Sequence, residues 1–301
     1  MPFAFRLRFL TATGFTSDAG TFEFPGPGGE TLRMEATTGG KPGDAKWLAV
    51  RNGGYKDESQ ARDAAEALRQ ELLVVGTLRR IGFEFGHDEV TGGMGKGFRE
   101  QVEAERGVKI RNSVHGIDVF EEGSVRETIF VDAGGTLTVS TSVDMFFSEL
   151  ERVRRASPSL SRRHVVAMEL LNQSCFPAST DAQFLARISS IEVLCKRTKR
   201  PQAQRDALDE LAESLSHIAL DPDAREQLRQ HVLYGKKVSI AEACREAVRG
   251  LLGPSRVADF ERLYKARSEL IHAGKGRRQT AELAIDAQSL ATDLLRADLK
   301  I

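Results

Sequence analysis

The sequence lacks the long apolar segments that mark membrane and secreted proteins. No run of eighteen or more apolar residues occurs, so no membrane-spanning helix is expected. The N-terminal residues Met-Pro-Phe-Ala-Phe-Arg-Leu-Arg alternate as a strand does, whereas a signal peptide has a continuous apolar core. We therefore expect a cytoplasmic protein without a membrane anchor.

Cysteine is scarce, and its placement argues against a disulfide framework. The three cysteines, Cys175, Cys195 and Cys244, are odd in number and widely spaced. Cys195 and Cys244 fall on the apolar faces of predicted helices, which predicts buried free thiols. Neither a metal nor a cofactor is expected.

An excess of charge of one sign is also missing. Lysine and arginine number 43, as do aspartate and glutamate, so the formal net charge is zero. A global basic field that would indicate a nucleic-acid partner is therefore absent. Local basic clusters remain, and their simplest interpretation is solvated helix ends; they are Arg152 to Arg155, Arg162 and Arg163, Lys196 to Arg200, and Lys275 to Arg278.

What the chain does contain is typical of a globular protein with two domains. It has 301 residues, of which 41% are hydrophobic and 29% charged. Turn-rich segments with strand periodicity dominate up to residue 141, and helical periodicity dominates afterwards. The predicted fold class is an α+β domain over residues 1–141 followed by an all-α helical bundle over residues 142–301.

The first domain is predicted to be a sheet covered by one long helix. Phe3 to Phe9 places its phenylalanines and leucine on one face and Ala4, Arg6 and Arg8 on the other, as a half-buried strand requires. Apolar residues recur at three- and four-residue steps from Asp57 to Arg80, which predicts a helix over the sheet. Further strands are predicted at residues 21–24, 31–36, 46–51, 82–85, 116–120, 125–131 and 136–140.

Two short segments of this domain resemble ligand sites only superficially. Gly92 to Gly97 contains a Gly-Lys pair but lacks the glycine spacing and following hydroxyl of a phosphate-binding loop, so a mobile loop is predicted. His87, Asp88 and Glu89 are consecutive, and three consecutive side chains do not converge on one metal without distortion. We predict no metal site there.

The second domain is predicted to be a series of amphipathic helices with recognisable caps. Ser157-Pro158 is interpreted as an N-cap followed by proline at the first helical position, with the helix continuing to Asn172. Asp181, Ser239 and Ser255 are predicted to cap three later helices. Isolated histidines on these helices, such as His164, His217 and His231, are predicted to have structural roles.

The helix from Phe260 to Gly276 is the most unusual stretch in the chain. Phe260, Leu263, Tyr264, Leu270 and Ile271 form an apolar stripe, and Arg267 falls inside it. A guanidinium on a buried face is costly unless it is paired. His272 follows five positions later, near Gly274, which is expected to cap the helix.

Tyr264-Lys-Ala-Arg-Ser-Glu-Leu-Ile-His-Ala-Gly274 resembles the signature of the HEPN superfamily, in which arginine precedes histidine by four to six residues. The closest similarity is to Apea-like HEPN domains, in which an earlier helix is similar to Phe184 to Leu194. The resemblance covers roughly residues 180 to 300. It implies a metal-independent endoribonuclease that acts as a toxin or antiphage defence effector. The N-terminal domain would then sense a small-molecule or protein trigger, or restrain the bundle.

The resemblance implies a set of site residues in which Arg267 and His272 are catalytic. Ser268 follows the arginine, where active members of the superfamily often have Asn, Asp or His. Histidine titrates near neutrality and serves as an acid or base, and arginine offers a forked donor set to phosphate oxygens. The RNA-binding residues expected beside them are Tyr264, Lys275, Arg277 and Arg278.

Helical geometry indicates that one chain does not complete this site. Positions five apart diverge by roughly 140° on a regular helix, so Arg267 and His272 do not share a face. Pairing two bundles about a two-fold axis would bring both residue types to one cleft, and the resemblance implies such a homodimer.

Three alternatives to catalysis stay open. Arg267 is structural if it pairs with a buried carboxylate, for which Glu192 on the other family-like helix is the candidate, and His272 then only caps carbonyls. The bundle would in that case be a non-catalytic HEPN module that binds RNA, a nucleotide or a protein, or a purely structural dimerisation bundle.

Overall fold

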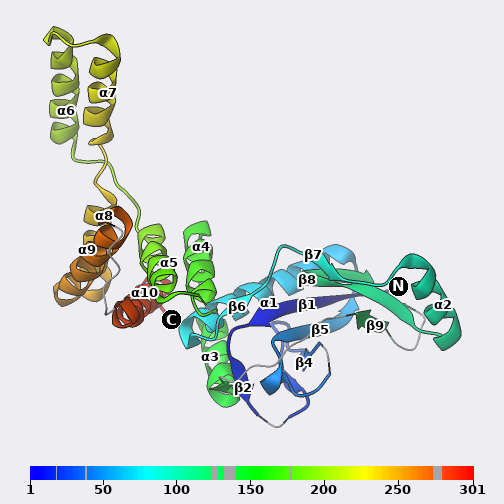
Figure 1. The fold of residues 1–301 in the computed structure, drawn as a ribbon. Coiled ribbons are helices and arrows are strands. Elements are labelled where there is room, and N and C mark those ends of the chain that lie inside the picture. The colour runs from blue at the N-terminus through cyan, green and yellow to red at the C-terminus, as the bar shows by residue number, and fades with distance from the viewer. Residues whose placement is uncertain (18, 38, 124–127, 132–139, 177, 274–279) are drawn as a thin grey trace.

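The chain forms an antiparallel sheet region followed by a helical region (Figure 1). The computed structural model describes residues 1–301 except 18, 38, 124–127, 132–139, 177 and 274–279. The helix α3 begins at Val143, directly after the last described strand. The coarse order predicted from the sequence, sheet first and helices second, is therefore confirmed.

The main sheet has the strand order β3-β4-β5-β1-β8-β7, with β6 on β1 and β9 parallel to β8. A parallel pair of β2 and β10 stands apart from it. The strands are β1 (Phe3–Thr11), β2 (Gly14–Thr16), β3 (Phe22–Pro25), β4 (Thr31–Ala36), β5 (Trp47–Tyr55), β6 (Phe83–Glu84), β7 (Glu89–Gly92), β8 (Lys109–Glu121), β9 (Thr128–Val131) and β10 (Ser140–Ser142). Of the strand predicted at 136–140, residues 136–139 lie outside the described residues.

The central strand β1 is buried on both faces, so the prediction of a half-buried strand is wrong. Its phenylalanines and Leu7 enter the hydrophobic core as expected. Arg6 and Arg8 on the opposite face are only 1% and 2% exposed. Aromatic rings cover them: Arg6 lies 4.1 Å from the Phe130 ring centroid and Arg8 lies 3.6 Å from that of Trp47. Cation–π contacts and hydrogen bonds let the guanidinium groups be buried there.

Helix α1 (Glu58–Arg79) packs on the apolar face of the sheet, as predicted. Asp57 caps it by accepting a hydrogen bond from the backbone of Gln60 at 2.9 Å. Helix α2 (Lys96–Arg106) was not predicted. It begins at the lysine of the Gly-Lys pair, so the prediction of a mobile loop at 92–97 is wrong for that end of the segment.

The helical region matches the predicted order, but several caps differ. Ser157 ends α3 in a left-handed conformation with φ of 42°, and Ser161 caps α4 in a capping box with His164. Ser179, not Asp181, caps α5, while Ser239 caps α8 as predicted. Ser255 lies in a 3₁₀ turn before α9. The helices are α3 (Val143–Ala156), α4 (Arg162–Gln173), α5 (Thr180–Leu194), α6 (Gln202–Ser214), α7 (Pro222–Tyr234), α8 (Ile240–Leu252), α9 (Val257–Ala273) and α10 (Thr280–Leu299).

The junction between sheet and helices is built around a buried amide. Asn172 of α4 is 1% exposed and accepts a hydrogen bond from the backbone N–H of Phe83 at 2.8 Å. Its amide nitrogen donates to Thr77 Oγ1 at 2.6 Å and to the Met168 carbonyl at 2.9 Å. One hydrophobic cluster continues from the sheet through α1, α3 and α4 into the bundle. The division at residue 141 is therefore a change of secondary structure within a continuous core.

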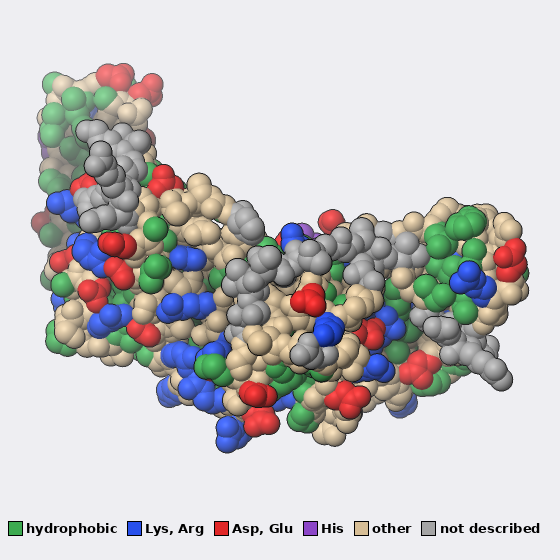
Figure 2. Space-filling view, turned by 60° about the horizontal axis from the view of Figure 1, so that its bottom comes forward, with side chains coloured by type: hydrophobic (Ala, Val, Ile, Leu, Met, Phe, Trp, Pro, Cys, Tyr) green, Lys and Arg blue, Asp and Glu red, His purple; other side chains and the backbone are tan. Residues whose placement is uncertain are grey.

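Helices α6 and α7 form a hairpin that projects from the end of the molecule opposite to α2 (Figure 1). Residues 202–234 are all described, and Ala212 and Leu215 alone are buried among them. The stem of the hairpin is closed by backbone hydrogen bonds from Arg200 to the Lys236 carbonyl at 2.9 Å and from Val238 to the Thr198 carbonyl at 3.0 Å. Asp and Glu side chains gather at the tip, whereas Lys and Arg gather between the bundle and the sheet on the face shown in Figure 2.

Candidate functional site

The candidate site lies on α9, which ion pairs connect to its neighbours. Phe260, Leu263 and Ala266 are buried and form its inner face. Charged pairs on the outer side join it to α8 and α10: Arg245–Glu261 at 3.1 Å and Arg262–Asp286 at 2.6 Å. Arg256, in the turn before α9, pairs with Asp259 of α9 at 2.9 Å and with Asp293 of α10 at 2.7 Å. The helix is therefore held at several points, and its side chains project from a fixed backbone.

Arg267 pairs with Glu192 of α5, the carboxylate named from the sequence. Arg267 Nε lies 3.3 Å from Glu192 Oε1, and Nη2 donates to Oε2 at 3.5 Å. The two side chains are 24% and 16% exposed. Burial raises the pKa of the Glu192 carboxyl, and the charge of Arg267 partly opposes that rise. The pair explains how an apolar stripe accommodates the guanidinium.

Tyr264 lies beside this pair and is half-buried. Its ring centroid is 5.4 Å from that of Phe260, and Arg267 Cζ is 5.8 Å from the Tyr264 centroid. Burial, followed by the nearby Glu192 charge, raises the pKa of the Tyr264 phenol. Tyr264 thus packs at the edge of the Arg267–Glu192 pair.

The remaining predicted site residues follow Arg267 towards the end of the helix. Ser268 is half-buried and His272 is exposed in the last turn of α9. Ser268 and His272 are one turn apart and share a face, while Arg267 points towards α5. Within one chain the structure therefore does not bring Arg267 and His272 together on one helix face. Lys275, Arg277 and Arg278, together with Gly274, lie outside the described residues.

Two thiols lie next to the Arg267–Glu192 pair. Cys195 ends α5 and Cys244 lies on α8, and they are 3% and 0% exposed. The prediction of buried free cysteines is confirmed for both. A hydrogen bond with Cys195, and then burial, raises the pKa of the Cys244 thiol far above its ordinary value. Cys244 is therefore a packing group at neutral pH, because the thiolate is the reactive form of cysteine.

A pocket that the sequence did not reveal opens beside Glu192. It has a volume of about 510 Å³ and is lined by Arg163, Glu192, Val193, Cys195, Arg197, Lys237 and Ile240. Its cations come from α4, from the segment after α5 and from the segment before α8. Two of them belong to the basic clusters that the sequence suggested were solvated helix ends. Their convergence depends on tertiary packing, which residue spacing does not encode.

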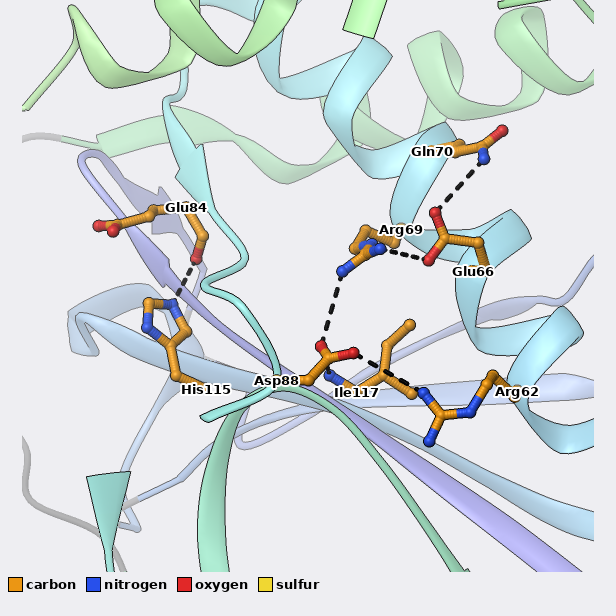
Figure 3. A network of polar contacts seen from close by, with 8 residues as sticks. All are labelled: Arg62, Glu66, Arg69, Gln70, Glu84, Asp88, His115 and Ile117. Carbon is orange, nitrogen blue, oxygen red and sulfur yellow. Dashed lines mark hydrogen bonds and ion pairs between the residues drawn. The ribbon is translucent and has the colours of Figure 1, made fainter. Parts of the chain in front are cut away.

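The turn at His87, Asp88 and Glu89 has a structural role (Figure 3). The Asp88 carboxylate accepts a hydrogen bond from the backbone N–H of Ile117 at 2.8 Å. Arg62 and Arg69 of α1 approach the same carboxylate at 3.7 and 3.6 Å. Asp88 therefore links α1 to β8. In the parts of the chain that the structure describes, no group of three or more His, Cys, Asp or Glu residues is arranged to hold a metal ion.

His115 and His164 are also accounted for by structural contacts. His115 Nε2 is hydrogen-bonded to the Glu84 carbonyl at 2.9 Å (Figure 3). The ring of His115 also meets that of Trp47 edge-on. His164 completes the α4 capping box and lies 2.9 Å from Asp298 of α10. The predicted structural role of His164 is thus confirmed.

Comparison with protein-family models, curated proteins and solved structures gave no match. Within the described helices, none combines the length and apolar character that crossing a bilayer requires.

Proposed function

We propose that the chain is a metal-independent endoribonuclease of HEPN type, acting as a toxin or antiphage defence effector. The observation that carries the proposal is on α9, where a partly exposed Arg267 precedes an exposed His272 in the last helical turn. A charged imidazole suits proton donation to the leaving 5′-oxygen, and a guanidinium suits the phosphorane oxygens.

The proposed site is composite, because Arg267 and His272 point in different directions on one helix. A homodimer formed through the C-terminal bundle would place the arginine of one chain near the histidine of the other. In this arrangement Glu192 is a positioning residue that orients the guanidinium through its ion pair. The attacking nucleophile is the 2′-hydroxyl of the RNA, so the reaction yields a 2′,3′-cyclic phosphate and a free 5′-hydroxyl. The sheet region would sense a small-molecule or protein trigger.

A second candidate function is a non-catalytic module that binds RNA, a nucleotide or a protein partner. The Arg267–Glu192 pair favours it, because the carboxylate neutralises the guanidinium that cleavage would use. RNA bound without being cut is the result that this candidate predicts.

Cleavage of transfer RNA and messenger RNA in EDTA tests the proposal. The wild type should cut RNA and leave cyclic-phosphate ends, while His272→Ala should lower the rate by about a hundred- to ten-thousand-fold. Arg267→Ala should have a comparable effect. His217→Ala is the matched control, since His217 is an exposed histidine on the projecting hairpin. Unchanged cleavage by both site variants would place the chemistry elsewhere.

A further inference from the structure

We propose that the pocket beside Glu192 binds a phosphate group of single-stranded RNA, and that Tyr234 at its edge stacks on a neighbouring base. The inference rests on the proposed function for the choice of RNA as ligand. It adds a binding site formed by α4, the end of α5 and the segments flanking the hairpin stem, with Tyr234 of α7 at its edge.

The charge of the pocket suits a phosphate. Arg163, Arg197 and Lys237 line it, against the single carboxylate of Glu192. Neighbouring cations at the stem are neutralised: Lys236 pairs with Asp209, and Arg200 pairs with Glu242 at 2.9 Å. By contrast, none of the three pocket cations forms an ion pair with a carboxylate among the described residues. An excess of unneutralised positive charge in a concave site attracts anions.

Backbone carbonyls hold the two pocket arginines in place. Arg163 donates from Nη1 to the Cys195 carbonyl at 2.9 Å, and Arg197 donates from Nε to the Val238 carbonyl at 2.7 Å. These bonds leave further N–H groups of each guanidinium for a ligand, since arginine carries five donors. Groups fixed before binding lose less conformational entropy when the anion arrives. The pocket is therefore preorganised for phosphate oxygens.

Tyr234 supplies an aromatic surface next to these cations. It is 68% exposed at the end of α7, although a tyrosine that only fills space would be buried. Its hydroxyl accepts a hydrogen bond from Arg197 Nη1 at 2.6 Å, and Arg197 Cζ lies 4.5 Å from its ring centroid. The guanidinium thus covers part of the ring and fixes its orientation, and the exposed part is left for a base. Exposed aromatic rings beside cations are typical of single-strand binding.

Acidic residues set the direction in which a strand would leave Tyr234. Tyr234 also lines one groove along α7, which carries Asp223 and Glu226 further along the helix, and the hairpin tip is acidic in Figure 2. Phosphates are repelled there. The favourable path runs from Tyr234 through Arg197 and Lys237 to the Arg267–Glu192 pair.

Fluorescence anisotropy with a labelled single-stranded RNA of mixed sequence tests the site. Measurements in EDTA on a His272→Ala background keep the strand intact. Lys237→Gln should weaken binding and reduce the slope of log affinity against log salt by about 0.7, the change expected for one lost phosphate contact. Lys56→Gln, the same change at an exposed lysine between β5 and α1, should leave both quantities unchanged.

A second pair of variants tests the base contact. Tyr234→Ala should lower affinity by about tenfold, and Tyr234→Phe should stay close to the parent because it keeps the ring. Equal binding by Lys237→Gln and Lys56→Gln, or absence of RNA binding by the parent, would overturn the inference. Equal loss in the Phe and Ala variants would overturn stacking.

The experiments distinguish a failure of the pocket proposal from a failure of the ribonuclease proposal. If the wild type binds RNA through the pocket but does not cut it, the ribonuclease proposal fails and the pocket stands. If the wild type cuts RNA and Lys237→Gln cuts it with unchanged KM, the pocket proposal fails and the ribonuclease proposal stands.

Discussion

The junction around Asn172 and the α6–α7 hairpin differ in how many of their side chains are buried. At the junction, α1, α4 and β6 bury both apolar side chains and a hydrogen-bonded amide. In the hairpin, the two short helices and the turn between them bury only Ala212 and Leu215 and leave Leu211, Leu228 and Tyr234 exposed. Helices of this length are marginal without tertiary packing. The comparison indicates that stability is concentrated at the junction, whereas most side chains of the hairpin face solvent.

A matched pair of leucine truncations should give the largest contrast. Leu171 of α4 is 0% exposed, and Leu211 of α6 is 51% exposed. Leu171→Ala should lower the free energy of unfolding by about 2–5 kcal/mol, because it leaves a cavity in the core, and Leu211→Ala by less than about 0.5 kcal/mol. Urea unfolding measures both. A large cost at Leu211 would mean that the hairpin is covered in solution, for example by a second chain.

Removing the side-chain amide of Asn172 at the junction should have the next largest effect on the free energy of unfolding. Asn172→Ala leaves the Phe83 N–H and the Thr77 hydroxyl without this partner in a buried site. A loss of about 2–4 kcal/mol in the free energy of unfolding is expected. Asn52→Ala is the control, because Asn52 donates one part-buried hydrogen bond to Tyr55. Similar losses of stability in the two variants would show that the junction amide contributes no more than an ordinary part-buried hydrogen bond.

The Glu192 carboxyl should give a smaller, pH-dependent effect. Because its pKa is raised in the folded chain, the folded state binds its proton more tightly than the unfolded state does. Its contribution to the free energy of unfolding should therefore fall as the pH rises from the ordinary glutamate pKa through the raised one. The free energies of unfolding of the wild type and of Glu192→Gln, measured at several pH values across that acid range, give this contribution as their difference.

Glu226 provides the opposite case within the hairpin. Hydrogen bonding to Gln230 lowers the pKa of Glu226 in the folded chain. The free energy of unfolding of the wild type, relative to that of Glu226→Gln, should therefore rise with pH. If the stability of the wild type relative to Glu192→Gln also rises with pH, the attraction of Arg267 lowers the pKa of Glu192 by more than burial raises it.

Thiol labelling should show the smallest effect. In the native chain, Cys195 and Cys244 should be protected from a thiol reagent, while Cys175 is partly exposed and should react slowly, since burial raises its pKa too. In denaturant all three should react. Fast native labelling of Cys244 would show that the bundle opens where the hairpin joins it.

Hydrophobic periodicity predicted the long helices and strands well, but it did not predict which residues pack against their polar faces. The repeats of α1, α5 and α10 predicted real helices because one face of each is buried in the core. The alternation of β1 suggested that Arg6 and Arg8 face solvent, because a polar residue opposite an apolar face usually does. Phe130 and Trp47 cover them instead, and those aromatic residues are distant in sequence.

The candidate site was predictable to the extent that it is local. Arg267, Ser268 and His272 lie on one helix, and the partner of Arg267 followed from the cost of burying a charge. The pocket required Arg163, Arg197 and Lys237 to meet from three segments. Runs of basic residues hinted at the first two, but their convergence is a property of the folded chain.

The closed stem brings the two ends of the hairpin together at one place on the bundle. Thr198 and Arg200 are hydrogen-bonded to Val238 and Lys236, so the chain leaves the bundle and returns to it at the same place. Segments whose two ends lie side by side tolerate changes of length or replacement without disturbing the rest of the fold. We therefore expect the bundle to fold with a shortened or exchanged hairpin. A change in the hairpin surface would then leave the folding of the bundle unaffected.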